Sequence, residues 1–305
     1  MSDVPTSAAN AAATATAAAA APAATPAATA ATPAATAATV VAVLDDLRAE
    51  SGELDRLVGD TGEGSWALDT PAPGWTVAHQ IAHLAWTDRA ALLAATDPDA
   101  FAAHAADALK AAGTFVDDGA REGAALPPSA LLAQWRAGRE ELQRVLRAAP
   151  AGARFPWYGP PMSAASVATA RLMETWAHAQ DVADALGVRR VPTDRLRHVA
   201  RIGVRARDYA YFVRGLSAPE EEFRVELTAP SGAVWTYGPA DAAQRVTGPA
   251  LDFCLLATQR AHRADLALRA DGPDADRWLD IAQAFAGPPG RGREAGARQP
   301  KAGEA

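Results

Sequence analysis

The sequence of 305 residues predicts a mainly α-helical protein, with a four-helix bundle followed by a small α+β domain. Four long segments carry apolar residues at helical spacing and are separated by loops rich in Gly and Pro. After about residue 215 the apolar pattern changes to period two, which is typical of strands. Residues 1–38 and 288–305 show neither pattern and are rich in Ala, Thr, Pro and Gly, so we expect both to be disordered tails.

The bundle is expected to span residues 39–190. Its long helices are predicted at residues 40–58, 76–95, 129–148 and 163–187. Thr76 and Ser163 are residue types that favour the N-cap, and Gly187 suits the position after the last helical turn. A short alanine-rich helix is expected at about 99–112. Antiparallel helices joined by such loops form bundles, in which sites are built from side chains that point inward.

The second domain is expected to span residues 191–287. Its predicted elements are a linking helix at 194–214, strands at 223–227 and 234–237, a third strand at 243–248, and helices at 249–263 and 273–286. The first two strands are joined through Ser231-Gly232, which is a hairpin signal.

Composition excludes several classes of protein. The formal net charge is −7, and an acidic chain does not attract polyanions, so we expect no nucleic-acid partner. Cys254 is the single cysteine, which excludes an internal disulfide and a cysteine-based zinc site. We see no signal peptide and no run of about 18 apolar residues, so no membrane association is expected, and the expected location is cytoplasmic.

Three side chains carry the candidate chemistry. Glu174 and His178 are four residues apart and therefore share one helical face. His83 lies on another predicted helix and would complete a His/Glu/His set for a divalent metal, most simply Zn²⁺. Three protein ligands that leave a position open are the arrangement of catalytic zinc sites.

Spacing alone leaves other interpretations open. Asp181 shares the face of Glu174 and His178, where it would orient His178 or bind the ion directly. His79 is four residues before His83, but a histidine near a helix N-terminus is the simpler interpretation. The whole group would also fit a hydrogen-bonded polar cluster without a metal.

Two motifs resemble a known family. Trp75-Thr76-Val77 followed by His83-Leu84, and then Glu174-x3-His178-x2-Asp181, resemble the N-terminal domain of mycothiol-dependent maleylpyruvate isomerase. That domain belongs to the DinB/YfiT-like metal-binding four-helix bundles. The resemblance covers about residues 40–190. It implies that His83, Glu174 and His178 are the metal ligands and that His79 is not one.

The resemblance is looser in the second domain. In the isomerase, an arginine from a Gly-Arg pair at the end of a helix assists catalysis, which would correspond to Arg260 here. Gln259 replaces the glycine of that pair. The same region also resembles a segment of tRNA wybutosine-synthesis proteins.

Together these features predict a divalent-metal-binding protein that acts as a mycothiol-dependent isomerase or thiol S-transferase. Its partners would be a small-molecule thiol, mycothiol itself if the resemblance extends that far, and a small organic electrophile. The alternatives are a non-catalytic metal-binding protein, a metal-dependent hydrolase and, more remotely, a protein related to tRNA wybutosine synthesis. An unblocked cleft lined by Trp157 or Tyr158 and by an arginine would favour an enzyme, whereas a fourth protein ligand, such as His79 or Asp181, would favour the non-catalytic protein.

Overall fold

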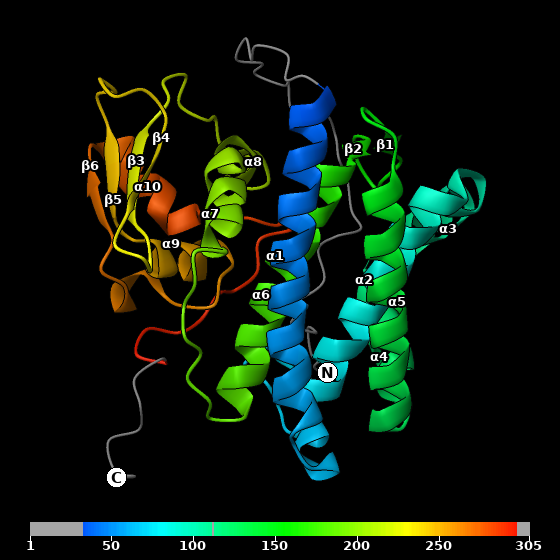
Figure 1. Cartoon of the computed structure of the whole chain (residues 1–305). Helices are drawn as coiled ribbons and strands as arrows, with labels where there is room; N and C mark the ends of the chain where they lie inside the picture. Colours follow the sequence, from blue (N-terminus) through cyan, green and yellow to red (C-terminus); the bar gives the residue numbers. More distant parts are fainter. Residues whose placement is uncertain (1–32, 112, 298–305) are drawn as a thin grey trace, which may run out of the picture. The chain divides into compact units, whose positions relative to one another are not determined.

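The computed structural model describes residues 33–111 and 113–297, which form two compact units that divide after Arg189 (Figure 1). The first unit is helical and the second combines helices with a small sheet, so the predicted fold class is confirmed. Most of the predicted N-terminal tail lies outside the described residues. Residues 33–38, which we assigned to that tail, belong to the first helix instead, because alanine is the best helix former and proline is well placed in a first turn.

The first unit is a bundle of four long helices with shorter elements around it. In chain order its elements are α1 (Pro33–Gly59), η1 (Glu63–Ala67), α2 (Val77–Thr96), α3 (Pro98–Lys110), α4 (Phe115–Ala124), α5 (Pro128–Ala148), β1 (Arg154–Phe155), β2 (Met162–Ser163) and α6 (Ala164–Ala185). Helix α2 packs against α5 and α6, and α1 packs against α6 and α5. The core between them includes Leu54, Ile81, Leu84, Leu131 and Trp135, all buried.

Three predicted helix ends of the bundle are confirmed. Thr76 is the N-cap of α2, and the side chain of Ser163 accepts a hydrogen bond from the Ser166 backbone at the start of α6. Gly187 follows α6 with a φ of +65°, a left-handed conformation that glycine adopts without steric strain. These residues fix the start of α2 and both ends of α6, the two helices that carry the candidate metal ligands.

Helix α4 was not predicted, and its glycines explain why. Gly119 and Gly123 lower the helix propensity of this segment. A Cβ on Gly119 would lie 2.8 Å from the Trp86 indole nitrogen, and one on Gly123 would lie 2.8 Å from the Ala82 Cβ. The glycines therefore allow α4 to approach α2 closely, and this tertiary contact outweighs the local preference.

The second unit is a four-stranded sheet with helices packed on it. Its elements are α7 (Leu196–Arg205), α8 (Arg207–Phe212), β3 (Arg224–Thr228), β4 (Val234–Tyr237), β5 (Arg245–Pro249), α9 (Ala250–Ala257), η2 (Arg263–Asp265), β6 (Arg269–Asp271) and α10 (Pro273–Ile281). The strand order is β4-β3-β5-β6. The predicted hairpin pairs β3 with β4, while β5 pairs parallel with β3 and antiparallel with β6. Helices α9 and α10 pack against the sheet and α7 packs against α9.

Three predicted boundaries in this unit were wrong. The linking helix is interrupted at Ala206, giving α7 and α8. The helix predicted at 249–263 ends at Ala257, because Gln259 adopts a left-handed conformation that turns the chain. The last helix stops at Ile281 rather than near 286, and β6 was missed because three residues are too short to show a period.

The described part of the predicted C-terminal tail makes hydrogen bonds within the second unit. Residues 288–297 contain no helix or strand, yet they are held to the second unit. The backbone nitrogen of Gly296 lies 2.9 Å from both carboxylate oxygens of Asp265. Hydrogen bonds of this kind leave no apolar period in the sequence, so composition alone indicated disorder.

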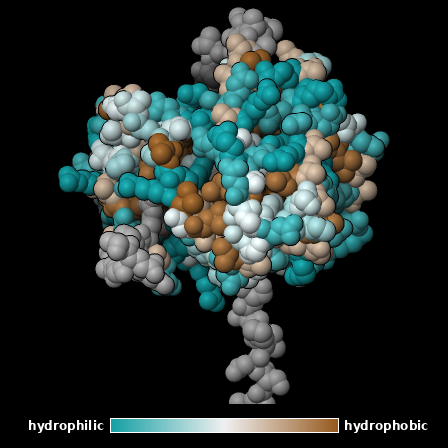
Figure 2. Space-filling view, turned by 60° about the horizontal axis from the view of Figure 1, so that its bottom comes forward, coloured by the Kyte–Doolittle hydropathy of each residue, from teal (hydrophilic) through white to brown (hydrophobic). Residues whose placement is uncertain are grey.

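The face of the molecule drawn in Figure 2 is predominantly hydrophilic. On the face drawn in Figure 2, hydrophobic residues are interspersed among hydrophilic ones. Within the described residues, none of the helices has the combination of length and apolar character that crossing a bilayer requires.

Candidate metal centre

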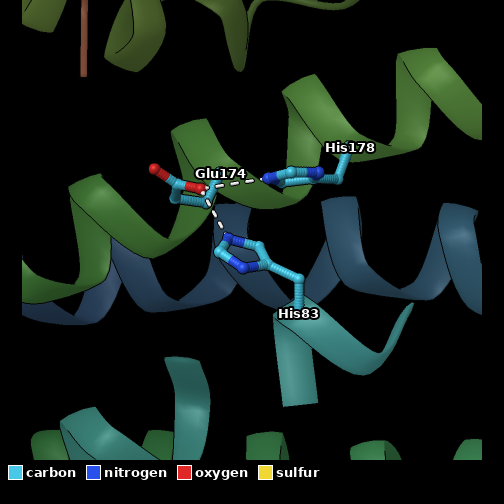
Figure 3. A group of neighbouring side chains, drawn as sticks. All are labelled: His83, Glu174 and His178. Atoms are coloured by element: carbon cyan, nitrogen blue, oxygen red, sulfur yellow. Dashed lines mark hydrogen bonds and ion pairs between the residues drawn. The ribbon is translucent and has the colours of Figure 1, made fainter. Parts of the chain in front are cut away.

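Three buried side chains from two helices converge inside the bundle. His83 extends from α2, and Glu174 and His178 extend from α6, one helical turn apart (Figure 3). Their exposed fractions are 0% for His83, 9% for Glu174 and 2% for His178. Among the described residues, these three form the group of His, Cys, Asp and Glu side chains whose ligand atoms all lie within 4.8 Å of one another.

The spacing of the donor atoms fits a single small cation. The Glu174 Oε2 atom lies 3.4 Å from His83 Nε2 and 3.2 Å from His178 Nε2. Tetrahedral zinc with ligand distances of about 2.0–2.1 Å places neighbouring donors roughly 3.3 Å apart. The second carboxylate oxygen of Glu174 points away from both imidazoles in Figure 3.

A hydrogen-bond chain sets the orientation of His178. Thr70 donates its hydroxyl hydrogen to the Trp75 carbonyl at 2.7 Å, so toward Gln80 the same hydroxyl acts as an acceptor. The Gln80 amide nitrogen donates to it at 2.9 Å, which turns the Gln80 oxygen toward His178 Nδ1 at 2.5 Å. His178 Nδ1 therefore carries a hydrogen, and Nε2 is the ring nitrogen that faces Glu174. A lone pair facing a carboxylate requires a proton or a cation between them.

The sequence suggested Asp181 as a residue that orients His178. In the structure, Nδ1 of the His178 ring is hydrogen-bonded to the side-chain oxygen of Gln80. Asp181 is buried but lies outside the group of three. Gln80 was overlooked, although it precedes His83 by three residues and so lies on the same face of α2. Metal-bound histidines commonly donate their second ring nitrogen to an oxygen acceptor, which is the arrangement seen for His178.

Trp75 covers the two histidines. Its ring lies 6.0 Å from that of His178 in a stacked arrangement and 5.3 Å from that of His83. The Trp75 indole nitrogen donates to Asp117 on α4 at 3.0 Å, so the unpredicted helix fixes this side chain. A large aromatic ring in this position limits the access of water to the cluster.

Electrostatics keep Glu174 ionised. Burial alone would raise its pKa, but hydrogen bonds with His178 and His83 and their positive charge outweigh this and hold the pKa well below its usual range. His83 Nδ1 is buried and has no hydrogen-bond partner among the described residues. A cluster with an anionic acceptor and two imidazoles fits a divalent cation by its chemistry as well as by its spacing.

His79 has a different role. Its Nδ1 atom lies 2.9 Å from the Thr76 hydroxyl and 3.3 Å from the Thr76 backbone nitrogen, which donates to it. Burial lowers the pKa of His79, and the nearby charge of Arg121 lowers it further. His79 therefore satisfies groups at the start of α2 and is not part of the group of three.

A buried ion pair joins the same two helices close to the cluster. Arg171 donates from Nε to Asp88 at 2.8 Å, and both side chains are at most 8% exposed. Arg171 precedes Glu174 by three residues on α6, and Asp88 follows His83 by five residues on α2. The pair ties α2 to α6 next to the candidate ligands.

The loop before α6 packs on α3 through aromatic rings. Trp157 stacks on Phe101 with ring centroids 5.7 Å apart, and the Tyr158 hydroxyl lies 2.7 Å from His104 Nε2. Burial raises the pKa of Tyr158. Trp86 links this aromatic group to His83, with ring centroids 6.2 Å apart.

Arg260, the other residue singled out from the sequence, lies in the second unit. It follows α9, where its Nη1 atom donates to the Thr258 carbonyl at 2.6 Å. The backbone at Gln259 has a φ of +60°. Gln259 thus keeps the left-handed conformation for which glycine is favoured, which costs about 1–2 kcal/mol for other residues.

Comparisons with known proteins agree with the predicted fold and family. Residues 47–183 match the family "Mycothiol maleylpyruvate isomerase N-terminal domain", and residues 219–271 match the family "Wyosine base formation". The chain is 60% identical over 248 residues to the uncharacterized proteins Rv0036c and MT0041 of two strains of Mycobacterium tuberculosis, a match that covers 81% of this chain and 96% of each relative.

Solved structures of a mycothiol-dependent maleylpyruvate isomerase and of a histidine mutant of it have a similar fold. Each has a TM-score of 0.52 at 18% identity, covering 77% of this chain and 95% of the other. The family model matches the bundle, and the relatives with 60% identity extend over most of the chain. The protein therefore belongs to the mycothiol-dependent maleylpyruvate isomerase-like family.

Proposed function

We propose that the protein binds a divalent metal, Zn²⁺ in the first instance, and is a mycothiol-dependent isomerase or thiol S-transferase that acts on a small organic electrophile. The observation that carries the proposal is the geometry of His83, Glu174 and His178. Both imidazole nitrogens lie from Glu174 Oε2 at the donor spacing of a tetrahedral ion, and the three donor atoms all lie within 4.8 Å of one another. Among the described residues no fourth ligand side chain joins them, which favours an open coordination position over a closed structural site.

Each residue has a distinct proposed part. His83, Glu174 and His178 hold the ion, Gln80 keeps His178 in the ligating tautomer, and Trp75 shields the cluster from water. When bound, a divalent ion would lower the pKa of a coordinated thiol and so supply a nucleophile at neutral pH. Arg260 is the proposed anchor for a carboxylate of the thiol or of the substrate, because guanidinium binds carboxylates in a forked geometry.

The thiol assignment is supported by the family match and by the similar solved structures, which are those of a mycothiol-dependent maleylpyruvate isomerase. A second candidate, a role connected with tRNA wybutosine synthesis, rests on the match of residues 219–271. The net charge of −7 disfavours an RNA partner, so we prefer the small thiol.

Cobalt substitution tests the proposal. With Co²⁺ in the site, adding mycothiol or a simpler thiol should produce an intense sulfur-to-metal charge-transfer band and release protons, because the metal binds the thiolate. Arg260→Ala should retain the cobalt spectrum but weaken binding of a thiol that carries a carboxylate. A cobalt spectrum that millimolar thiol leaves unchanged would eliminate the thiol mechanism and favour a hydrolase or a non-catalytic metal protein.

A further inference from the structure

The second unit contains a cavity of about 640 Å³ that the proposed function does not use. Its walls come from the end of α9, from η2, from α10 and from residues 290–293. Leu256, Leu268 and Leu279 contribute apolar surface to it. A volume of this size is within the range of about 300–1,000 Å³ found for small-molecule sites.

Arginines dominate the charge of the cavity. Four of them line it: Arg214, Arg263, Arg291 and Arg293. Asp280 is the acidic residue among the described lining residues, and Arg263 already binds it at 2.6 Å. The lining therefore carries an excess of positive charge.

Two of the lining arginines, Arg214 and Arg291, have no acidic partner among the described residues. Arg214 donates only to neutral oxygens, those of the Ala210 backbone at 3.0 Å and the Gln283 side chain at 3.4 Å. Burial lowers the pKa of Arg214, as expected for a cation with no counterion nearby. An anion in the cavity would provide that counterion.

Gln259 is the second, independent sign of a ligand. It lines the cavity, and its side-chain oxygen is buried without a hydrogen-bond partner among the described residues. Of the described residues other than glycine, it alone has a positive φ. The Gln259 backbone nitrogen donates to the Leu256 carbonyl, and the Arg260 backbone nitrogen donates to the Leu255 carbonyl. This pair of hydrogen bonds is typical of helix C-termini, where glycine usually occupies the position of Gln259. Strained backbone and an unsatisfied buried acceptor together are typical of functional positions.

We propose that this cavity binds a small organic anion, a carboxylate or phosphate ester with an apolar body and an N–H or O–H donor. Arg214 and Arg291 bind the anionic group and the leucines contact the body. The Gln259 side chain, whose oxygen is buried without a ligand, turns toward the cavity and accepts the donor's hydrogen. The bonds between Gly296 and Asp265 hold residues 290–293 in place as one wall. The site goes beyond the proposed function, because it requires neither the metal nor the thiol.

Isothermal titration of the full-length protein at low salt tests this site, with hippurate as the carboxylate that has an amide N–H and phenyl phosphate as the phosphate ester. At least one of the two compounds should bind with a dissociation constant of millimolar or below. The compound that binds more tightly identifies the anionic group that the site prefers. Arg291→Gln should weaken binding by about tenfold, because charge-assisted hydrogen bonds are strong. Arg277→Gln, an exposed arginine on α10 outside the lining, should leave it unchanged.

Gln259→Gly separates a binding role from a structural one. Glycine removes the backbone strain, so the melting temperature should rise, while hippurate binding should weaken more than binding of benzoate, which lacks the N–H. His83→Ala should leave anion binding intact. A failure of the metal proposal can therefore be distinguished from a failure of the anion site. The site is disproved if neither anion binds at ten millimolar. It is also disproved if Arg291→Gln and Gln259→Gly both bind the anions with the affinity of the wild type.

Discussion

The two units of this chain build their candidate sites on different scaffolds. In the helical unit, acceptor atoms from α2 and α6 converge within 4.8 Å, and Gln80 and Trp75 hold the rings in place. In the α+β unit, donors on long arginine side chains surround a cavity of about 640 Å³, one wall of which lacks regular structure. A metal needs ligand directions fixed by rigid elements, whereas long, forked guanidinium groups reach an anion from several positions.

The largest expected effect tests the rigid side of this comparison. His83→Ala, Glu174→Ala and His178→Ala should each reduce the metal content of purified protein from about one ion per chain to a small fraction of that, because each removes one of three ligands. Elemental analysis by mass spectrometry measures the content. His79→Ala is the matched control and should keep the metal, since His79 contacts Thr76. Loss of metal from His79→Ala but not from Glu174→Ala would reverse the ligand assignment.

The next effect concerns the ion pair that joins α2 and α6. Asp88→Ala should lower the free energy of unfolding by about 3–5 kcal/mol, because it leaves the buried Arg171 without its counterion. Urea unfolding measures the change. The control Asp107→Ala removes an exposed partner of Lys110 and should change little. The double variant Asp88→Leu with Arg171→Met should recover much of the lost stability. Equal free energies of unfolding for Asp88→Ala and Asp107→Ala would contradict the proposed role of the pair.

Gln80 provides a finer test of how the bundle orients its ligands. Gln80→Leu should weaken metal affinity by about 10–100-fold, because His178 loses the acceptor that fixes its tautomer. Competition with a chromophoric chelator measures the affinity. Gln180→Leu is the matched control, because the Gln180 side chain bonds Asp184 on its own helix. Equal affinities in the two variants would show that the Gln80 contact does not tune the site.

The smallest expected effect is a pH dependence in the bundle away from the site. Burial alone would raise the pKa of Asp55, but Arg136 and Arg139 outweigh this and hold the pKa below its usual value of 3.8. A lowered folded-state pKa means that this stabilisation is present above about pH 4 and is lost as the pH falls through the folded value. Urea midpoints between pH 5 and pH 3 should fall less for Asp55→Asn than for the wild type. Parallel pH profiles would show that the arginines do not stabilise the Asp55 charge.

Local sequence signals determined much of this protein. Apolar periodicity and the residues Thr76, Ser163 and Gly187 predicted the long helices and their ends, since these depend on interactions within one helical turn. The four-residue spacing of Glu174 and His178 placed them on one face for the same reason. Period-two alternation predicted the hairpin of β3 and β4, because its strands are adjacent in the chain.

Only the tertiary structure decided the interactions between distant segments. The meeting of His83 with Glu174, the choice of Gln80 over Asp181, and the parallel pairing of β3 with β5 depend on how separate elements pack. Helix α4 forms despite its glycines because they allow contact with α2. The early end of α9 depends on a left-handed glutamine, which carries no turn signal of its own. Such features depend on burial and on partners far along the chain, and neither is encoded in a local period.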